Sequence, residues 1–404
     1  MKATLILVSL GVWASACSQA TPSQGSGDSA AIATKAAATP CANCGQPLEG
    51  LSPEQLAQFE EGLEDFEEVE GVEDGLGPVF NDAGCAVCHN LPDIGGTSEV
   101  KVTRFGAVGA GGVFDPLANL GGSLRQDHGI GELGTCGVRA EITPPQANVV
   151  ANRRTSALFG LGLLEGVPDA LIVGLAATQP ASVRGTVNWL TDLASGQRRV
   201  GRFGWKGQVA TLLTFAGDAY LNEMGITSPI FAQENCPQGN CAVLADCDTV
   251  ADPEDDGTSI RNFANFMRML APPKRGPSTV ATVFGELLFA SAGCATCHTP
   301  VLVTGASDIA PLNFATFQPY TDLLLHDMGA LGDGITQGLA TGRLMRTPPL
   351  WGVSAQPFLL HDGRAATLDE AIRAHDGQAR ASRDSYAAMS ATKRSWILAF
   401  LRSL

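Results

Sequence analysis

The stretches CAVCH at residues 85–89 and CATCH at residues 294–298 have the same spacing, C-x-x-C-H. Two cysteines on one helical turn can form thioether bonds to the two vinyl groups of one haem, and the adjacent histidine can then reach the iron. One such stretch can arise by chance, but both copies follow similar frames, FNDAG at 80–84 and FASAG at 289–293. The repeat therefore predicts two covalently bound haem c groups. The residues that would attach them and supply the proximal ligands are Cys85, Cys88, His89, Cys294, Cys297 and His298.

A zinc ion is the competing interpretation of the same cysteines. The four thiolates of the two motifs could form a tetrahedral all-sulfur site. Such a site would leave the histidine that follows each cysteine pair without a role, whereas haem attachment uses it. Haem is therefore the favoured interpretation.

The internal repeat continues beyond the two motifs. RTSALFG at 154–160 parallels RTPPLWG at 346–352, and WKGQVATL at 205–212 aligns with HDGRAATL at 361–368. The positions at which the two halves differ therefore predict how the two haem sites differ.

The most informative difference concerns the second axial ligand. Thr367 and Glu370 have the spacing of a capping box, which predicts the start of a helix, and His375 lies on that helix. The corresponding residue of the first half is Ala219, which cannot bind iron. We therefore expect His298 and His375 on the two faces of the second haem, and an open face on the first.

An open face predicts catalysis in addition to electron transfer. Five-coordinate iron can bind peroxide or another small oxidant, and cleavage of the O–O bond requires a group that moves a proton. Glu223, eleven residues after Leu212, is the candidate by sequence, and a surface carboxylate on a helix is the alternative. Trp205 takes the place of His361 in the repeat, where an indole could carry electrons between two haems. The alternative for Trp205 is a core tryptophan.

Composition and the first residues predict an exported protein of two domains. The chain has 404 residues, 45% of them hydrophobic, and a formal net charge of −15, which disfavours nucleic acid as a partner. The apolar run at 3–14 follows Lys2 and is too short to span a membrane, so residues 1–16 are expected to form a signal peptide. Cys17 would be the lipidated first mature residue, and an ordinary signal peptide cut near Ala16 is the alternative.

The segment after the signal peptide is expected to lack a packed core. Residues 17–50 are interpreted as a lipoprotein-type flexible tether, because residues 18–40 are rich in Ser, Thr, Ala and Gly. Residues 52–74 follow, with ten acidic residues, no Lys or Arg, and a capping-box start, SPEQ. They predict a helix whose acidic face either docks a basic electron donor or, more simply, is solvated.

Seven segments resemble the di-haem cytochrome c peroxidase and methylamine-dehydrogenase-maturation superfamily, most closely its di-haem oxidoreductase branch, also described as thiol oxidoreductases. They run in order from about residue 75 to the C-terminus: GLGPVFNDAGCAVCHNLPDIGG, ALFGLGLLEGVPDA, RFGWKGQVATLL, NEMGITSP, YTDLLLHDMG, RTPPLWG and LLHDGRAATLDEAIRAHDG. The resemblance implies a mainly α fold of two cytochrome-c-like haem domains packed face to face, with extensive loops. We expect these domains at 51–275 and 276–404.

The same resemblance implies roles for individual residues. His89 and His298 would be the proximal ligands, and His375 stands where relatives have Met or Tyr as the distal ligand of the second haem. Trp205 would be the tryptophan between the haems, and Glu223 the active-site glutamate.

Two departures from the family pattern count against ordinary peroxidase activity, though not against the di-haem assignment. The glutamine that accompanies the active-site glutamate in peroxidases would fall near Phe215. A histidine at position 375 also lowers the expected reduction potential of the second haem, since Met ligation raises it.

Several other cations are expected near the haems. The residues that would contact the propionates, or else the backbone or solvent, are His326, His361, Arg343, Arg346 and Arg364. His128 matches no family motif and is expected at the surface, although as a loop ligand it could close the first haem in one redox state.

Six further cysteines need partners. They are Cys41, Cys44, Cys136, Cys236, Cys241 and Cys247, and they allow up to three disulfides in fifteen pairings. CANC at 41–44 lacks a following histidine, so it is no third haem site. A structural disulfide is favoured there over a redox-active pair.

The expected function is that of an exported di-haem c-type cytochrome oxidoreductase in the periplasm or at the cell surface. Electrons from a small redox protein would enter at the C-terminal haem, and hydrogen peroxide or a similar oxidant would be reduced at the N-terminal haem. Contact with a membrane would come only through the lipid anchor, and some relatives also hold calcium between the domains. The alternative is an electron-transfer cytochrome with both haems six-coordinate and no peroxidase activity.

Overall fold

The computed structural model describes residues 41, 43–134 and 136–404. The predicted signal peptide at 1–16, the predicted lipidation site Cys17 and most of the predicted tether lie outside the described residues, and these expectations stay predictions.

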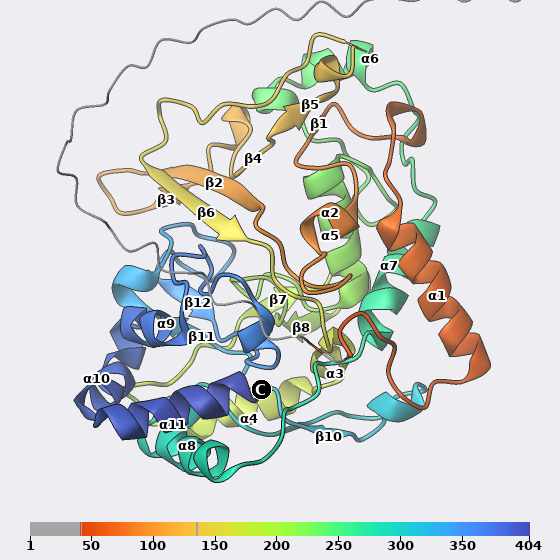
Figure 1. Cartoon of the computed structure of the whole chain (residues 1–404). Coiled ribbons are helices and arrows are strands. Elements are labelled where there is room, and N and C mark those ends of the chain that lie inside the picture. The colour runs from red at the N-terminus through yellow and green to blue at the C-terminus, as the bar shows by residue number, and fades with distance from the viewer. Residues whose placement is uncertain (1–40, 42, 135) are drawn as a thin grey trace, which may run out of the picture. The chain divides into compact units, whose positions relative to one another are not determined.

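The acidic segment forms the first helix, α1 (Pro53–Glu67), as the capping pattern predicts. Ser52 Oγ accepts a hydrogen bond from Gln55 N at 3.2 Å, and Gln55 Oε1 accepts one from Ser52 N at 3.0 Å. The helix packs along α7 (Thr258–Met269) (Figure 1), burying Phe59 and Phe66 against Phe266 at ring-centroid distances of 5.3 and 4.7 Å. The apolar face of α1 is thus fixed, and the glutamates point away from it.

The C-terminal part is also built on paired helices. The long elements here are α8 (Val280–Ser291), α9 (Leu368–Ala374), α10 (Arg380–Ala388) and α11 (Ala391–Arg402). Helices α8 and α11 lie side by side (Figure 1). A Cβ added at Gly285 would overlap the backbone of Trp396, so glycine is required for this close approach. Phe289, Phe400 and Tyr320 fill the core between these helices.

Helix is the main regular element, at 37% of the structure. The remaining α-helices are α2 (Cys85–Cys88), α3 (Leu161–Glu165), α4 (Asp169–Thr178), α5 (Leu212–Met224) and α6 (Leu244–Cys247). Short 3-10 turns are η1 (Val72–Asp74), η2 (Ala118–Leu120), η3 (Ile130–Glu132), η4 (Pro237–Gly239), η5 (Cys241–Val243), η6 (Cys294–Thr296), η7 (Ala310–Leu312), η8 (Gly329–Leu331), η9 (Val353–Ala355) and η10 (Gly377–Ala379).

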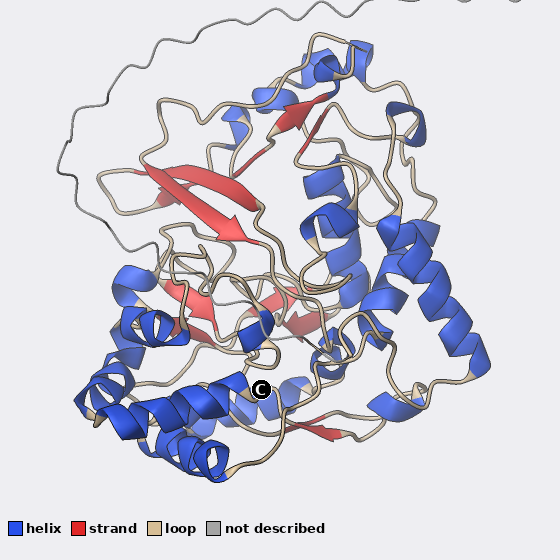
Figure 2. Cartoon of the chain, in the orientation of Figure 1, coloured by secondary structure: helices blue, strands red, loops and turns tan. Residues whose placement is uncertain are grey.

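Small antiparallel sheets accompany the helices (Figure 2). Strand β2 (Lys101–Val108) pairs with β6 (Val149–Arg154) from Lys101 opposite Arg154 to Gly106 opposite Val149. The same strand also pairs with β3 (Phe114–Asp115) and β4 (Leu124–Arg125). Two-stranded pairs join β1 (Val79–Phe80) to β5 (His128–Gly129), β7 (Trp189–Thr191) to β8 (Arg198–Val200), β9 (Leu302–Val303) to β10 (Thr316–Phe317), and β11 (Leu325–Asp327) to β12 (Leu344–Arg346).

The hydrophobic core crosses the expected domain boundary at residue 275. Leu302, Leu312 and Phe317 belong to the same cluster as the residues buried under α1 and α7, whereas Phe289 and Phe400 belong to a separate cluster in the C-terminal part. The division into 51–275 and 276–404 stays a prediction. In the structure, the segment 302–324 packs against the N-terminal half.

The six additional cysteines form three disulfides: Cys41–Cys44, Cys136–Cys247 and Cys236–Cys241. The expectation of three pairs is confirmed. Among the described cysteines, those left free are the four of the two C-x-x-C-H motifs.

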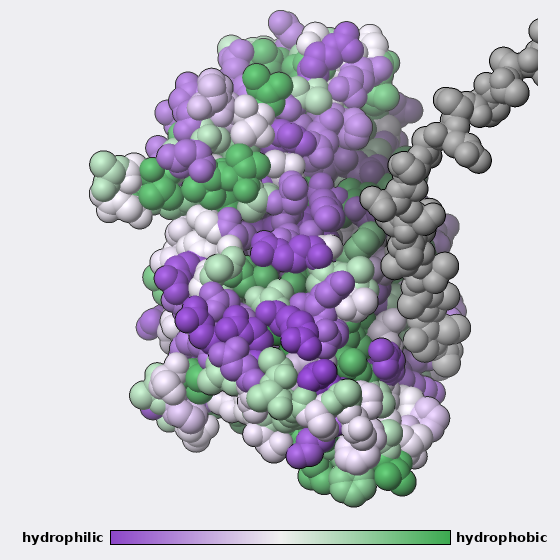
Figure 3. Space-filling view, turned by 60° about the vertical axis from the view of Figure 1, so that its left-hand side comes forward, coloured by the Kyte–Doolittle hydropathy of each residue, from purple (hydrophilic) through white to green (hydrophobic). Residues whose placement is uncertain are grey.

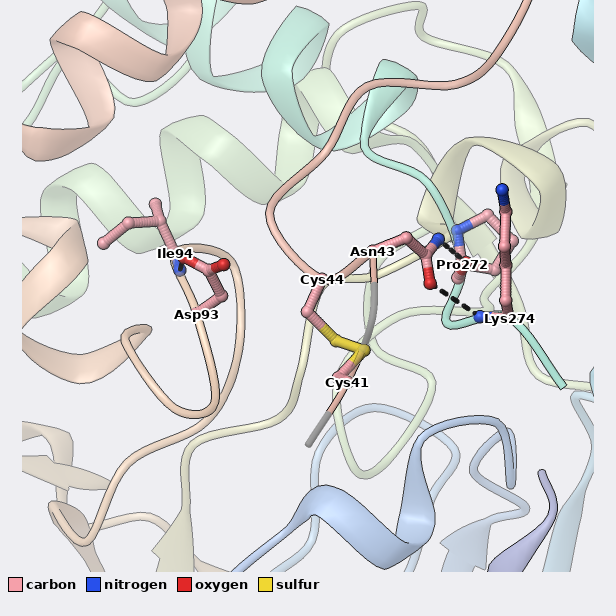
Figure 4. The surroundings of a disulfide bond; sticks show 7 residues. All are labelled: Cys41, Asn43, Cys44, Asp93, Ile94, Pro272 and Lys274. Carbon is pink, nitrogen blue, oxygen red and sulfur yellow. Dashed lines mark hydrogen bonds between the residues drawn. A yellow bond between two sulfur atoms is a disulfide. The ribbon is translucent and has the colours of Figure 1, made fainter. Parts of the chain in front are cut away.

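The flexible tether predicted over 17–50 is wrong for residues 43–48, which are bonded to the folded part of the chain. Leu48 N donates to Met269 O at 2.8 Å, Ala271 N donates to Gln46 O at 2.9 Å, and Cys44 is only 3% exposed. Figure 4 shows the same attachment through Asn43, whose amide bonds the backbones of Pro272 and Lys274 at 2.9 and 2.8 Å. These backbone pairings arise far along the chain, so composition could not reveal them.

Across the part of the chain that the structure describes, no helix is long and apolar enough to cross a membrane. Hydrophilic residues cover much of the face shown in Figure 3, with hydrophobic residues mixed among them.

Candidate haem site

Both proximal-ligand candidates are held in the tautomer that a metal requires. His89 Nδ1 lies 2.9 Å from Gly96 O, and His298 Nδ1 lies 3.0 Å from Tyr320 O. A carbonyl oxygen only accepts, so Nδ1 carries the ring proton and Nε2 keeps its lone pair. Burial lowers the pKa of each imidazole to about 4, so both rings are neutral at pH 7.

The carbonyl that orients His298 belongs to Tyr320, which lies in a strained part of the backbone. Tyr320 has a φ of 54° and Leu323 a φ of 60°, both in the left-handed region that non-glycine residues seldom adopt. Tyr320 is buried, and its hydroxyl donates to Glu286 Oε1 at 2.6 Å. The loop is therefore fixed at both the backbone and the side chain.

His375 shares the geometry of the two proximal candidates. Its Nδ1 lies 2.8 Å from Ala371 O, which again leaves Nε2 as the lone-pair donor. It was expected on helix α9, but that helix ends at Ala374, and His375 is the residue that caps its C-terminus. Its backbone is extended there, with φ −60° and ψ 135°.

The rings of His298 and His375 are neighbours and are tilted by 57° to one another. Their centroids are 6.4 Å apart. Two imidazoles that bind one metal through Nε2 have their centroids about 6 Å apart, given metal–nitrogen bonds of about 2 Å and about 1 Å from each ring atom to its centroid. The separation therefore suits an axial pair on one iron.

The second motif lines a cavity of about 440 Å³. Its lining includes Cys294, Cys297, His298, His375, Trp205 and His361. The structure thus brings together most of the residues predicted for the second haem. Among the described residues, those of the first motif and Glu223 do not line this cavity and form a separate group.

The motif cysteines occupy tight surroundings on single turns. Cys85 and Cys88 bound the four-residue helix α2, and Cys294 begins the turn η6. Burial raises the pKa of the Cys85, Cys88 and Cys294 thiols to about 12.

Trp205 lies between the two halves of the repeat. Its Nε1 donates to Arg154 O at 3.0 Å, the Arg154 guanidinium lies 5.3 Å from its ring, and the His361 ring lies edge-on at 6.2 Å. Arg346 donates through its backbone N to Trp205 O at 2.9 Å. The indole is therefore held by residues from both ends of the chain.

Arg154 and Arg346 are equivalent in the repeat and take equivalent places. Each is the last residue of a strand, β6 or β12, each is buried, and each lines the cavity. Burial lowers the pKa of both guanidinium groups to about 10, with no carboxylate hydrogen-bonded to either among the described residues. Two buried cations suit anionic groups such as propionates.

Glu223 is held beside the first motif by Asn81. Asn81 Nδ2 donates to Glu223 Oε2 at 2.6 Å, and Asn81 N donates to Glu223 O at 2.7 Å. Burial raises the pKa of the Glu223 carboxyl, although the Asn81 hydrogen bond and the charge of Arg104 oppose this. The Glu223 charge also helps to raise the pKa of Cys88, so the two side chains are close in space.

The remaining histidines have other partners. Burial lowers the pKa of His326, but the Asp322 carboxylate at 2.8 Å outweighs it and raises the pKa to about 10. With Cys297, these two residues could also hold a metal ion, but the imidazole is already committed to the carboxylate. Burial lowers the pKa of His361 to about 4, and His128 is exposed beside Glu132 at 3.2 Å.

Two of the candidate propionate partners lie at the surface. Arg343 pairs with Asp327 at 3.0 Å, and Arg364 pairs with Asp362 at 2.5 Å, with about half or more of each side chain exposed. Of the three arginines that the sequence singles out, Arg346 is the one in the cavity.

Sequence reasoning missed Asn81, Arg154 and Asp322. Asn81 belongs to the frame FNDAG, in which the second half has FASAG, so the same comparison that singled out His375 could have found it. Arg154 could have been found as the counterpart of Arg346. Nothing in the sequence indicates that Asp322 meets His326.

Comparison with known proteins identifies the family. The sequence profile of the family described as "Di-haem oxidoreductase, putative peroxidase" matches residues 144–404, well over half of the chain. The match includes the second motif, and the first motif precedes it. No curated protein matches the chain.

Solved structures resemble the chain over most of its length. Hydrazine synthase from Kuenenia stuttgartiensis is 13% identical, with 94% of this chain and 100% of that chain covered and a TM-score of 0.41. A MauG-like protein associated with microbial copper homeostasis is 17% identical, with 90% and 92% covered and a TM-score of 0.37. The dihaem peroxidase BthA from Burkholderia thailandensis is 15% identical, with 88% and 86% covered and a TM-score of 0.39. These likenesses are distant and say nothing about activity.

Proposed function

The chain belongs to the di-haem oxidoreductase family, and from this premise we propose that it is an oxidoreductase with two covalently bound haem c groups. Electrons enter at the C-terminal haem, and hydrogen peroxide or a similar small oxidant is reduced at the N-terminal haem. Cys85, Cys88 and His89 hold the first group. Cys294, Cys297, His298 and His375 hold the second.

The observation that carries this proposal is the shared geometry of three histidines. His89, His298 and His375 each bond a backbone carbonyl through Nδ1, at 2.9, 3.0 and 2.8 Å, and so present Nε2. Chains that bind a metal through imidazole commonly fix the ring in this way. The other described cysteines are paired in disulfides, so the four motif thiols remain for attachment.

The inequality of the two sites supports a division of labour. The ring of His375 lies 6.4 Å from that of His298, so these two imidazoles would both be able to bind one iron of the second haem. The aromatic ring that contacts His89 is that of Phe66, with 5.9 Å between the ring centroids. Within the described residues, no histidine ring contacts His89. When bound, a haem with one open axial position supplies a place where a small oxidant binds and receives electrons.

The chain's own residues supply the proton handling at the first site. Glu223 is buried beside Cys88, and burial raises the pKa of its carboxyl, which favours the protonated form that a proton donor needs. The Asn81 amide fixes one oxygen of this carboxyl, so the other can take up and release the proton.

Trp205 suits an electron path between the sites. It lines the cavity of the second motif, its indole is oriented by the hydrogen bond from Nε1 to Arg154 O, and its backbone is bonded to Arg346. A rigid aromatic side chain between two redox groups can pass electrons with little reorganisation.

We also propose the finer arrangement that the sequence predicts. The halves at 51–275 and 276–404 form two cytochrome-c-like domains that face one another across Trp205. The protein is exported, is held at the membrane by lipid on Cys17, and receives electrons from a small redox protein. Some relatives hold calcium between these domains, and the same position is proposed here.

Mass spectrometry and electron paramagnetic resonance test the proposal together. Protein secreted from a host competent in cytochrome maturation should exceed the processed chain by the mass of two haem groups. Replacing both Cys85 and Cys88 with alanine should remove one group. A mass equal to the bare chain contradicts the proposal.

The oxidised protein should show one high-spin and one low-spin haem, and peroxide or cyanide should shift the high-spin signal. His375→Ala should convert the low-spin signal to a high-spin one. His128→Ala, the matched control on an exposed histidine, should change neither the high-spin nor the low-spin signal. Wholly low-spin haems in every redox state would instead identify an electron carrier. If the wild type has two low-spin haems and His128→Ala converts one of them to high spin, His128 is the ligand that closes the first site.

A further inference from the structure

A buried carboxylate without a partner lies away from the haem residues. Both carboxylate oxygens of Glu234 are buried, and neither has a hydrogen-bond partner in the structure. An ionised carboxylate in such a place is costly unless it is paired with a cation. Something absent from the protein chain is therefore expected to meet it.

Two other carboxylates converge on the same point. One ligand oxygen from each of Glu234, Asp252 and Glu254 lies within 4.8 Å of the other two. Oxygens that bind one Ca²⁺ at about 2.4 Å are at most about 4.8 Å apart. The three oxygens are thus within reach of a single ion.

The chain itself does not neutralise this cluster. Burial, together with the negative charges of Glu254, Asp248 and Asp252, raises the pKa of Glu234 to about 9. Among the ion pairs of the described residues, none joins Lys, Arg or His to Glu234, Asp252 or Glu254. The repulsion is left for a bound cation to relieve.

The surrounding backbone holds two of the three carboxylates in place. Thr227 N donates to Glu254 Oε2 at 2.8 Å, the Thr227 hydroxyl donates to the same oxygen, and Thr227 Oγ1 also lies 3.3 Å from Asp252 Oδ1. A Cβ at Gly75 would overlap the side chain of Glu254, so glycine there makes room for it. Thr227 therefore positions Glu254 and also contacts Asp252.

We propose that Glu234, Asp252 and Glu254 form a binding site for one Ca²⁺ ion. Carboxylate oxygens are the ligands of hard divalent cations, and three carboxylates from loops suit Ca²⁺, which accepts six to eight oxygens in flexible geometry. Mg²⁺ demands near-ideal octahedral geometry and is usually bound by one or two carboxylates. The site lies wholly within the predicted N-terminal domain and is separate from any calcium between the domains.

The position of the site gives the ion a structural role. Asn235 Nδ2 donates to Leu221 O at 3.0 Å, so the segment carrying Glu234 is tied to the end of α5, the helix of Glu223. The segment 235–251 contains cysteines of two disulfides and is flanked in sequence by the proposed ligands Glu234 and Asp252. One ion would therefore hold the two ends of this segment together and fix it against α5.

Calcium titration of the full-length holoprotein tests the site independently of haem chemistry. After treatment with a chelator, the wild type should bind one equivalent of Ca²⁺ at this site in isothermal titration calorimetry, and its midpoint of thermal unfolding should rise by a few degrees. Glu234→Gln and Asp252→Asn should each lose this binding and this rise. Glu64→Gln, the same change on the exposed face of α1, should keep both.

The order of stabilities provides a second readout. In chelator, Glu234→Gln should unfold at the same temperature as the wild type or higher, because it replaces a buried carboxyl that Glu254, Asp248 and Asp252 surround with negative charge. With Ca²⁺ the order should reverse. Equal calcium binding and stabilisation in the wild type and both variants would overturn the proposal, as would a larger stabilisation of the wild type by Mg²⁺ at the same concentration.

Discussion

The Glu223 carboxyl joins three properties that proton transfer requires: burial, a raised pKa, and a fixed orientation from the amide of Asn81. Among the described residues, no other carboxylate near the first motif has all three properties and also lies beside Cys88. The role proposed for Glu223 therefore depends on its ionisable proton.

Replacing Glu223 with glutamine should lower the rate of peroxide reduction by about 100-fold or more, the usual contribution of a general acid or base. The amide keeps the size of the side chain and can still accept from Asn81, but it cannot exchange a proton. Steady-state peroxide consumption with a reduced electron donor measures the change. Asp308→Asn, the equivalent change on an exposed carboxylate outside the acidic segment, should retain full activity. An unchanged rate in Glu223→Gln would remove Glu223 from the mechanism.

Asn81→Ala should move the part of the pH–rate profile that reports Glu223 to higher pH. The amide stabilises the ionised carboxylate, so its loss favours the protonated form and raises the pKa further. The measurement is kcat against pH. A purely structural role for Asn81 would lower the rate at every pH without moving the profile, and Asn81→Ala should have no effect on the profile in a Glu223→Gln background.

Helix boundaries show which parts of an element can be predicted from local pattern. The capping boxes at Ser52 and Thr367 begin α1 and α9 as expected, because the bonds join residues three apart. The end of α9 was not foreseen, and His375 is one residue past it. The sheet of β2 and β6 was not foreseen either, since its partners are about fifty residues apart.

Thr367→Ala should destabilise the protein by about 1 kcal/mol, the usual cost of losing a helix N-cap. Thr367 accepts from Glu370 N at 3.2 Å, and α9 leads directly to His375. Thermal unfolding gives the stability, and the low-spin signal reports whether His375 has moved. Thr392→Ala, an exposed threonine inside α11, is the control and should change neither.

On the scale of the whole molecule, a buried ion cluster joins distant parts of the chain. Asp333 pairs with Arg153 at 2.7 Å and with Lys206 at 2.8 Å, and the three side chains are at most 4% exposed. Arg153 lies on β6, and Lys206 follows Trp205, so the cluster fixes the surroundings of the indole from the C-terminal half.

Asp333→Asn should destabilise the protein by about 3–5 kcal/mol, because it leaves two cations buried without a counter-charge. Chemical denaturation of the holoprotein measures the loss. Asp384→Asn removes the partner of Arg383 in an exposed pair, where Asp384 is 61% exposed, and should cost little. Equal effects of the two substitutions would contradict the importance of the buried cluster.

The two haem motifs, the repeat and the unequal second ligands are all written in short stretches of sequence, since attachment chemistry needs residues only a few positions apart. Folding alone establishes that Asn81 meets Glu223, that Asp322 meets His326, and that Glu234 converges with Asp252 and Glu254. Contacts of this kind depend on the path of the backbone between distant residues, and no local spacing records that path.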